Sequence, residues 1–227
     1  MDKTIKLILI LSFYSLGGYS QISYEEGYFV TVEDEEITCL IKNLDWRNHP
    51  KELKYKLSLS SNVEHIRIDS IKEFGINQAI KMIKANVNID VSNNNISMLT
   101  KSRAPLLEEQ EVLLNVLVEG KASLFSYQSN GVGKFFYSVD GSKIEQLIFK
   151  KYINRKKEIV ENNSFRQQLR NDLKCQSIYL FQFEKLGYNE ANLVELFTQY
   201  NMSNDAAYTN FEQKKSRDLF NLNIRPG

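Results

Sequence analysis

Two cysteines, Cys39 and Cys175, are the only thiols in the chain. A thiol pair can form a disulfide or remain as two buried free side chains, and an even number of cysteines in an exported protein favours the disulfide. We therefore predict a Cys39–Cys175 disulfide, with two free thiols as the alternative. In the chain-entropy model, closing a loop of about 135 residues would stabilise the fold by roughly 4–5 kcal/mol.

A cluster of basic side chains lies between positions 150 and 157. Its members are Lys150, Lys151, Arg155, Lys156 and Lys157. Positive charges at this density can contact anionic lipid headgroups or the phosphates of lipopolysaccharide. A solvated charged surface is the default interpretation of such a run, and the anionic contact is the alternative.

One short segment resembles a nucleotide-binding loop. Ser129–Lys134 contains two glycines and ends in lysine, but Gln128 and Phe135 stand where the Walker pattern requires a glycine and a serine or threonine. No nucleotide-binding helix is expected after it. We therefore predict a tight turn between two strands and no nucleotide.

Metal ligands and catalytic groups are sparse. The two histidines, His49 and His65, lie outside any His-Glu-x-x-His motif and away from the cysteines. The acidic run Glu33–Glu36 lacks the alternating ligands of a calcium loop, so a charged hairpin tip is the simpler interpretation. We predict no metal and no cofactor. Glycosidic acid/base catalysis requires only two carboxylates, and with so many acids in the chain the sequence singles out no pair.

The first twenty residues have the pattern of an export signal. Lys3 and Lys6 precede the apolar run Leu7–Leu16, and small residues occupy the first and third positions before a cleavage site between Ser20 and Gln21. This apolar run has half of the roughly 20 residues that a membrane-spanning helix needs. We predict cleavage after Ser20 and export to the periplasm or outer membrane.

Removal of residues 1–20 leaves equal numbers of basic and acidic side chains. A nucleic-acid-binding protein needs a basic surface that displaces counterions from phosphates. A formally neutral chain therefore argues against a nucleic-acid partner. The remaining residues suffice for one large domain or two small ones.

Alternating apolar and polar residues predict a succession of strands up to about residue 153. The segment 53–59 is the clearest case, because Leu53, Tyr55, Leu57 and Leu59 alternate with polar residues. The remaining predicted strands are 27–32, 36–46, 63–76, 87–91, 112–119, 122–128, 135–139 and 144–153, with a loop over 93–111. For 144–153 a helix is the alternative.

Helical patterns begin after residue 163. Ser164 and Gln167 have the spacing of a capping box and predict a helix over 165–174. A second helix over 190–201 is indicated by an apolar stripe, which consists of Leu193, Leu196, Phe197 and Tyr200. The predicted fold class is α+β, mainly antiparallel β in a sandwich or open-barrel-like meander, closed by two C-terminal helices at 164–201.

The last residues form a polar linker over 202–218 and a terminal strand over 219–227. Phe220, Leu222 and Ile224 alternate with polar residues in that strand. A strand of a membrane barrel alternates in this way, and so does an ordinary edge strand of a soluble domain.

Several segments together characterise a known group of proteins. They are Gly27–Phe29, Cys39–Asn43, Trp46, Lys72–Ile76, Val118–Leu124, Phe165–Leu169 and Asp172–Cys175. With these segments, nearly the whole chain resembles uncharacterised exported proteins of Bacteroidota, in which an N-terminal soluble domain precedes an outer-membrane β-barrel. The resemblance implies a soluble domain at 21–201 and a barrel that starts near 219, but no activity. The sequence stops at Gly227, where such a barrel would only begin, which suggests a fragment of a longer chain.

These observations lead to one expectation and two alternatives. We expect a non-enzymatic cell-envelope domain with a structural or binding role, attached to an outer-membrane β-barrel. Its expected partner is the outer membrane or an envelope protein. A free periplasmic or secreted binding protein is the alternative, and a secreted hydrolase is less favoured.

Overall fold

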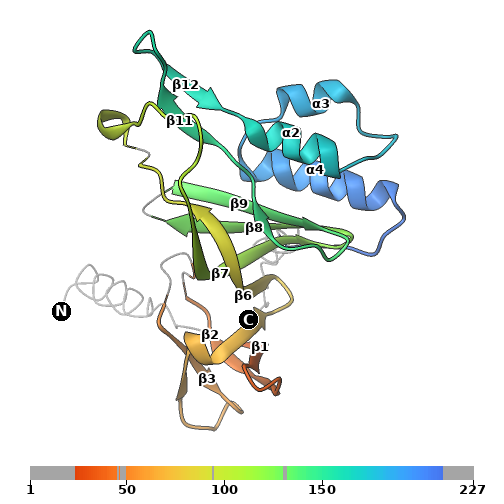
Figure 1. The fold of residues 1–227 in the computed structure, drawn as a ribbon. Helices are drawn as coiled ribbons and strands as arrows, with labels where there is room; N and C mark the ends of the chain where they lie inside the picture. The colour runs from red at the N-terminus through yellow and green to blue at the C-terminus, as the bar shows by residue number, and fades with distance from the viewer. Residues whose placement is uncertain (1–23, 45, 47–49, 94, 130–131, 212–227) are drawn as a thin grey trace, which may run out of the picture.

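An open antiparallel sheet of eleven strands dominates the fold. The computed structural model describes residues 24–211 except 45, 47–49, 94 and 130–131 (Figure 1). The strand order is β10-β9-β8-β7-β6-β5-β1-β2-β3-β4, with β13 paired to β7, and β11 and β12 form a separate hairpin. With its helices, this arrangement confirms the predicted α+β class.

The strands are β1 (Tyr24–Thr31), β2 (Glu36–Lys42), β3 (Glu52–Lys56), β4 (Glu64–Arg67), β5 (Ile71–Ile76), β6 (Ile80–Asp90), β7 (Leu107–Glu119), β8 (Ala122–Ser129), β9 (Val132–Val139), β10 (Glu145–Gln146), β11 (Lys150–Ile153), β12 (Ile159–Asn162) and β13 (Thr209–Asn210). The α-helices are α2 (Ser164–Asp172), α3 (Leu180–Lys185) and α4 (Glu190–Ser203), and short 3-10 turns are η2 (Ile68–Ser70) and η3 (Ile96–Met98). No helix in these described ranges is both long enough and apolar enough to cross a membrane.

Strands β1 to β5 enclose an N-terminal core. Its fully buried side chains include Phe29, Ile41, Leu53 and Phe74. The predicted strand 53–59 is too long, because β3 ends at Lys56 and a serine-rich turn follows. Two of its four apolar residues are consequently exposed, Leu57 by 56% and Leu59 by 84%.

Strands β6 and β7 connect the two parts of the molecule. They pair over nine consecutive residues, from Met82 opposite Asn115 to Asp90 opposite Leu107. The first residues of β7 lie in the predicted loop 93–111. The loop prediction was wrong there because the exposed carboxylates of this segment hide the strand pattern, whereas pairing with β6 satisfies its backbone.

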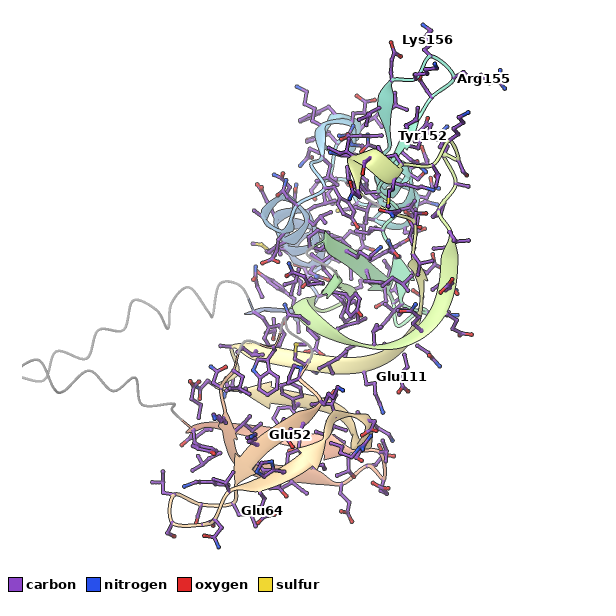
Figure 2. All side chains as sticks on the ribbon, turned by 90° about the vertical axis from the view of Figure 1, so that its left-hand side faces the viewer. Glu52, Glu64, Glu111, Tyr152, Arg155 and Lys156 are labelled. Atoms are coloured by element: carbon purple, nitrogen blue, oxygen red, sulfur yellow. The ribbon has the colours of Figure 1, made fainter. Side chains whose placement is uncertain are left out.

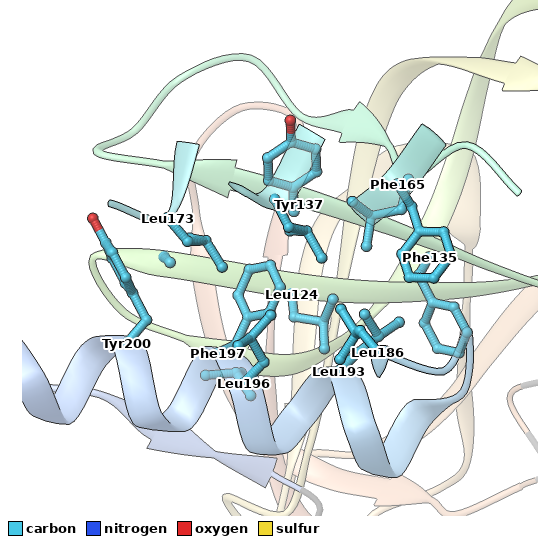
Figure 3. Packing of buried hydrophobic residues seen from close by; sticks show 14 of the residues in the cluster. Leu124, Phe135, Tyr137, Phe165, Leu173, Leu186, Leu193, Leu196, Phe197 and Tyr200 are labelled. Carbon is cyan, nitrogen blue, oxygen red and sulfur yellow. The ribbon is translucent and has the colours of Figure 1, made fainter. Parts of the chain in front are cut away.

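Three helices pack on the C-terminal part of the sheet and form a second core (Figure 3). The apolar stripe of α4 faces β8 and β9, as its spacing predicts, and its residues Leu193, Leu196, Phe197 and Tyr200 are buried. Helix α2 starts at Ser164, but the cap differs from the predicted capping box: the Asn162 side chain accepts hydrogen bonds from the amide and hydroxyl of Ser164, at 3.1 and 2.6 Å. Helix α3 was not predicted.

Part of the predicted linker 202–218 belongs to the sheet. Thr209 and Asn210 pair with Glu119 and Val118 of β7, and Phe211 is buried. The predicted terminal strand 219–227 and the predicted export signal lie outside the described residues.

Three tyrosines make the fold sensitive to alkali. Burial raises the pKa of Tyr28, Tyr137 and Tyr188, and hydrogen bonds to Glu73 and Asp172 raise the pKa of the first two further. The folded protein keeps these protons, whereas the unfolded chain releases them above pH of about 10. We therefore expect the free energy of unfolding to fall as the pH rises above about 10. Urea unfolding between pH 8 and pH 11 measures this, and an unchanged stability over that range would contradict the prediction. The Tyr188→Phe variant should show a shallower decline.

Candidate functional site

The two cysteines lie in different cores. Cys39 is in β2 within the N-terminal core, whereas Cys175 follows α2 and packs against the C-terminal core. Strand β8 contributes Ala122 and Leu124 to the C-terminal core, and five strand spacings of about 4.8 Å separate it from β2. A disulfide needs Cα atoms within about 7 Å. Both thiols are free, so the predicted disulfide is wrong. Burial raises the pKa of Cys39 to about 11, and a contact of 3.1 Å with the Ser177 hydroxyl lowers the pKa of Cys175.

Other sequence candidates do not assemble into a site. Ser20, Gln21 and His49 lie outside the described residues, so the cleavage site stays a prediction. The exposed His65 pairs with Glu52 at 3.2 Å. Within the described ranges, no three histidine, cysteine or acidic side chains are grouped as metal ligands require.

The loop-like segment Ser129–Lys134 connects β8 to β9 in a hairpin. Its lysine is buried and donates a hydrogen bond to the main-chain carbonyl of Asp90. Desolvation lowers the pKa of Lys134, and the charge of Asp90 acts in the opposite direction. The ammonium group of Lys134 is therefore hydrogen-bonded inside the fold and cannot contact the phosphate of a nucleotide.

Lys150 is the buried member of the predicted basic cluster. It is only 2% exposed, and its Nζ donates to the carbonyl of Ala104 at 2.7 Å. Alternation along β11 turns the next residue outward, so Lys151 is exposed and lies 3.9 Å from Glu161. Neither the solvated charge nor the alternative anionic contact therefore holds at Lys150: a buried, hydrogen-bonded ammonium cannot reach a surface ligand.

Arg155, Lys156 and Lys157 are exposed at the turn of the β11–β12 hairpin. Figure 2 shows the first two at its tip. The Asn154 side chain shapes this turn: its oxygen accepts from the amides of Lys156 and Glu158, at 2.9 and 3.0 Å, and its nitrogen donates to the Glu158 carboxylate at 2.8 Å. Among the described residues, no salt bridge involves the three cations of the tip. An ordered turn thus presents three positive charges to solvent.

The loop between β6 and β7 adds cations that the sequence analysis missed. Hydrogen bonds join it to the hairpin, from the amide of Ile153 to the carbonyl of Thr100 and from the Asn162 side chain to the carbonyl of Arg103, each at 3.0 Å. Lys101 and Arg103 are exposed on this loop. The sequence does contain an indication of this basic loop, because no acidic residue lies between positions 91 and 106. We call the exposed set the basic end: Lys101, Arg103, Lys151, Arg155, Lys156 and Lys157.

Charge is distributed unevenly along the molecule. The segments 91–106 and 150–163 together contain seven basic and only two acidic residues. The segment 24–42, which forms β1, β2 and their turn, contains six acidic residues and one basic residue. Figure 1 shows the β11–β12 hairpin at one end of the molecule, and β1, β2 and β3 toward the other. Basic and acidic side chains of a nearly neutral chain are therefore concentrated in different segments.

A groove of about 930 Å³ lies beside β1, β5 and β6. Lys81 lies in it, 2.7 Å from Glu119 and 3.7 Å from Glu73, and the Tyr28 hydroxyl donates to Glu73 at 2.8 Å. A lysine thus lies between the two carboxylates. This arrangement is a charge network, whereas a hydrolytic pair would present an acid and a base to a bond between them.

The chain matches no protein-family model, and no curated protein and no solved structure is significantly similar to it.

Proposed function

We propose that the chain is a non-enzymatic domain of the cell envelope that binds phosphate-bearing lipid surfaces through its basic end. The observation that carries this proposal is the ordered, exposed tip of the β11–β12 hairpin, where three cations have no intramolecular salt bridge among the described residues. Phosphatidylglycerol and lipopolysaccharide offer the same ligand chemistry, an anionic phosphate at the membrane surface.

Electrostatics supports an end-on orientation. The anionic surface attracts the basic end and repels the acidic residues around the β1–β2 turn, so the long axis of the molecule is aligned by its own charges. Each lysine or arginine near an anionic membrane contributes about 1 kcal/mol. The three tip residues alone therefore supply about 3 kcal/mol, a factor of about 100 in affinity.

A triple substitution at the tip tests the proposal. We expect Arg155→Gln/Lys156→Gln/Lys157→Asn to weaken binding to phosphatidylglycerol vesicles about 100-fold in a sedimentation assay at low salt. Asparagine suits position 157, where φ is +65°. Parallel vesicles with lipopolysaccharide in place of phosphatidylglycerol distinguish the two phosphate sources.

The matched control removes three exposed charges elsewhere, Lys51→Gln/Arg67→Gln/Lys143→Gln. It changes the net charge equally, and we expect a loss of less than about threefold because these residues lie away from the tip. Equal losses in both variants would show that net charge alone attracts the protein, and the proposal would then be wrong.

A connection to an outer-membrane barrel is a further part of the proposal. Its support is the alternation of Phe220, Leu222 and Ile224 together with the resemblance to exported Bacteroidota proteins. The test is the reading frame after Gly227: a succession of alternating segments of about ten residues is expected, and a stop codon there would refute the connection.

A further inference from the structure

Three neighbouring apolar side chains at the start of α3 are exposed although they are large. Tyr179 is 62% exposed, Leu180 48% and Phe181 55%. We call them the apolar triplet. The two aromatic rings are stacked, with centroids 6.0 Å apart and an angle of 10° between their planes. Contiguous exposed apolar residues of this size are typical of interaction sites.

The apolar triplet has no role in the core. Ile178, Phe183 and Leu186 supply the buried contacts of this segment. The stacked rings therefore stay on the outside after the packing requirements of α3 are met.

A chain of amide hydrogen bonds holds this segment in place. The backbone amide of Tyr179 donates to Gln182 at 2.8 Å, Gln182 donates to Gln199 at 3.0 Å, and Gln199 donates to the carbonyl of Ser177 at 2.9 Å. The triplet is thus anchored to α4 by side chains on both helices. An anchored apolar surface loses little conformational entropy when a partner covers it.

The surroundings of the triplet favour a lipid partner. Exposed lysines, Lys174 and Lys185, flank it along the chain next to the exposed acids Asp172 and Glu184, and no salt bridge among the described residues involves either lysine. Aromatic rings with flanking cations are typical of segments that lie at the membrane–water interface, where rings enter the headgroup region and ammonium groups meet phosphates.

The triplet is also connected rigidly to the basic end. Strand β12 leads directly into α2, with the Asn162 cap at the junction, and Arg166 of α2 donates to the carbonyl of Leu186 at 3.0 Å. Figure 1 shows the β11–β12 hairpin and α3 at the same end of the molecule, away from β1 to β4. A membrane surface laid across this end of the molecule can therefore meet both the hairpin and α3.

We infer that Tyr179, Leu180 and Phe181 insert into the interfacial region of the lipid bilayer that the basic end binds; the inference rests on the proposed function. Charge brings the domain to the surface, and the apolar triplet retains it there. This arrangement predicts binding that survives partly at high salt, because burial of apolar area is not screened by ions.

A tryptophan reporter tests insertion directly. Trp46 is the only tryptophan in the chain and is 6% exposed, so Trp46→Phe/Phe181→Trp places a single reporter in the triplet. With phosphatidylglycerol vesicles that contain brominated phosphatidylcholine, we expect a blue shift and quenching of the emission. Trp46→Phe/Leu59→Trp is the matched control at the opposite end, where neither change is expected. If Trp46→Phe alone destabilises the fold, Phe181→Trp in the parent chain gives the same readout above the constant signal of the buried Trp46.

A second version of the vesicle experiment, the tethered arm, separates this inference from the proposed function. A hexahistidine tag at the C-terminus holds the same variants on nickel-chelating vesicles, whatever the affinity of the basic end. Quenching of the reporter at 181 only in the tethered arm would support insertion and refute the proposed function. Binding without quenching in either arm would refute insertion alone. Phe181→Ser should weaken vesicle binding about tenfold, and less of its binding should survive at high salt than in the parent chain.

Discussion

Asn201→Asp should destabilise the protein by about 4 kcal/mol at neutral pH. Asn201 is fully buried, and its side chain forms two hydrogen bonds with one residue of β8: the nitrogen donates to the carbonyl of Ala122 at 2.8 Å, and the oxygen accepts from the amide of Ala122 at 2.9 Å. The substitution replaces the donor with a second acceptor that faces the Ala122 carbonyl. It also buries an unpaired charge between α4 and the sheet.

The effect of this variant should depend on pH in a defined direction. Burial raises the pKa of the introduced carboxyl above its unfolded value of about 3.9, so the folded state binds the proton more tightly. The destabilisation relative to the parent protein is therefore largest at neutral pH and shrinks as the pH falls toward about 4. Urea unfolding of both proteins at several pH values measures the difference, and a constant difference would contradict the mechanism.

Asn171→Asp is the matched control. Asn171 is exposed on α2, and its oxygen accepts a hydrogen bond from Gln167 at 2.7 Å, which a carboxylate can also accept. We expect a change of less than about 1 kcal/mol, because the added charge stays in water and the unfavourable interaction of an anion with the C-terminal end of a helix is no larger than that.

Asp90→Ala is the second substitution with a large expected effect, about 3–5 kcal/mol. Asp90 is 3% exposed, and its carboxylate accepts hydrogen bonds from the amides of Ser92 and Leu106, each at 2.9 Å. These bonds fix both ends of the loop that carries Lys101 and Arg103. Loss of the carboxylate also leaves the buried Lys134 without the charge that favours its protonated form.

Unfolding measurements and trypsin cleavage together test this prediction. We expect the loop to be cut after Lys101 and Arg103 much faster in the Asp90→Ala variant, since its ends are no longer held. Asp90→Asn keeps an acceptor oxygen but removes the charge, and adding Lys134→Met should recover part of the lost stability in that background. Wild-type stability of Asp90→Ala, within about 0.5 kcal/mol, would show that the carboxylate has no structural role.

Local patterns predicted the elements whose own residues form a clear apolar face. The stripe from Leu193 to Tyr200 specifies α4 because four apolar residues share one helical face, and that face is buried as expected. Alternation of apolar and polar residues located most of the strands, because alternate residues of a strand share one face of the sheet. The first residues of β7 escaped detection because their register is imposed by β6 and not by their own pattern.

Candidate site residues were harder to predict because a site depends on distance in space. The disulfide inference used the number of cysteines, which contains no geometry, and the fold places Cys39 and Cys175 in separate cores. Lys150 was grouped with its neighbours by sequence, although alternation along β11 buries it. Lys101 and Arg103 join the hairpin only through hydrogen bonds that no linear spacing predicts.

The long pair β6 and β7 has a mechanical consequence. An eleven-residue strand spans about 35 Å, and β6 reaches from the N-terminal core to the loop beside the hairpin. When the basic end contacts a membrane, the β6–β7 pair keeps β1 to β4, and the groove beside β1, away from the lipid. Under the proposed function the domain acts as a spacer, and shortening β6 and β7 by matched pairs of residues would lower the groove toward the lipid.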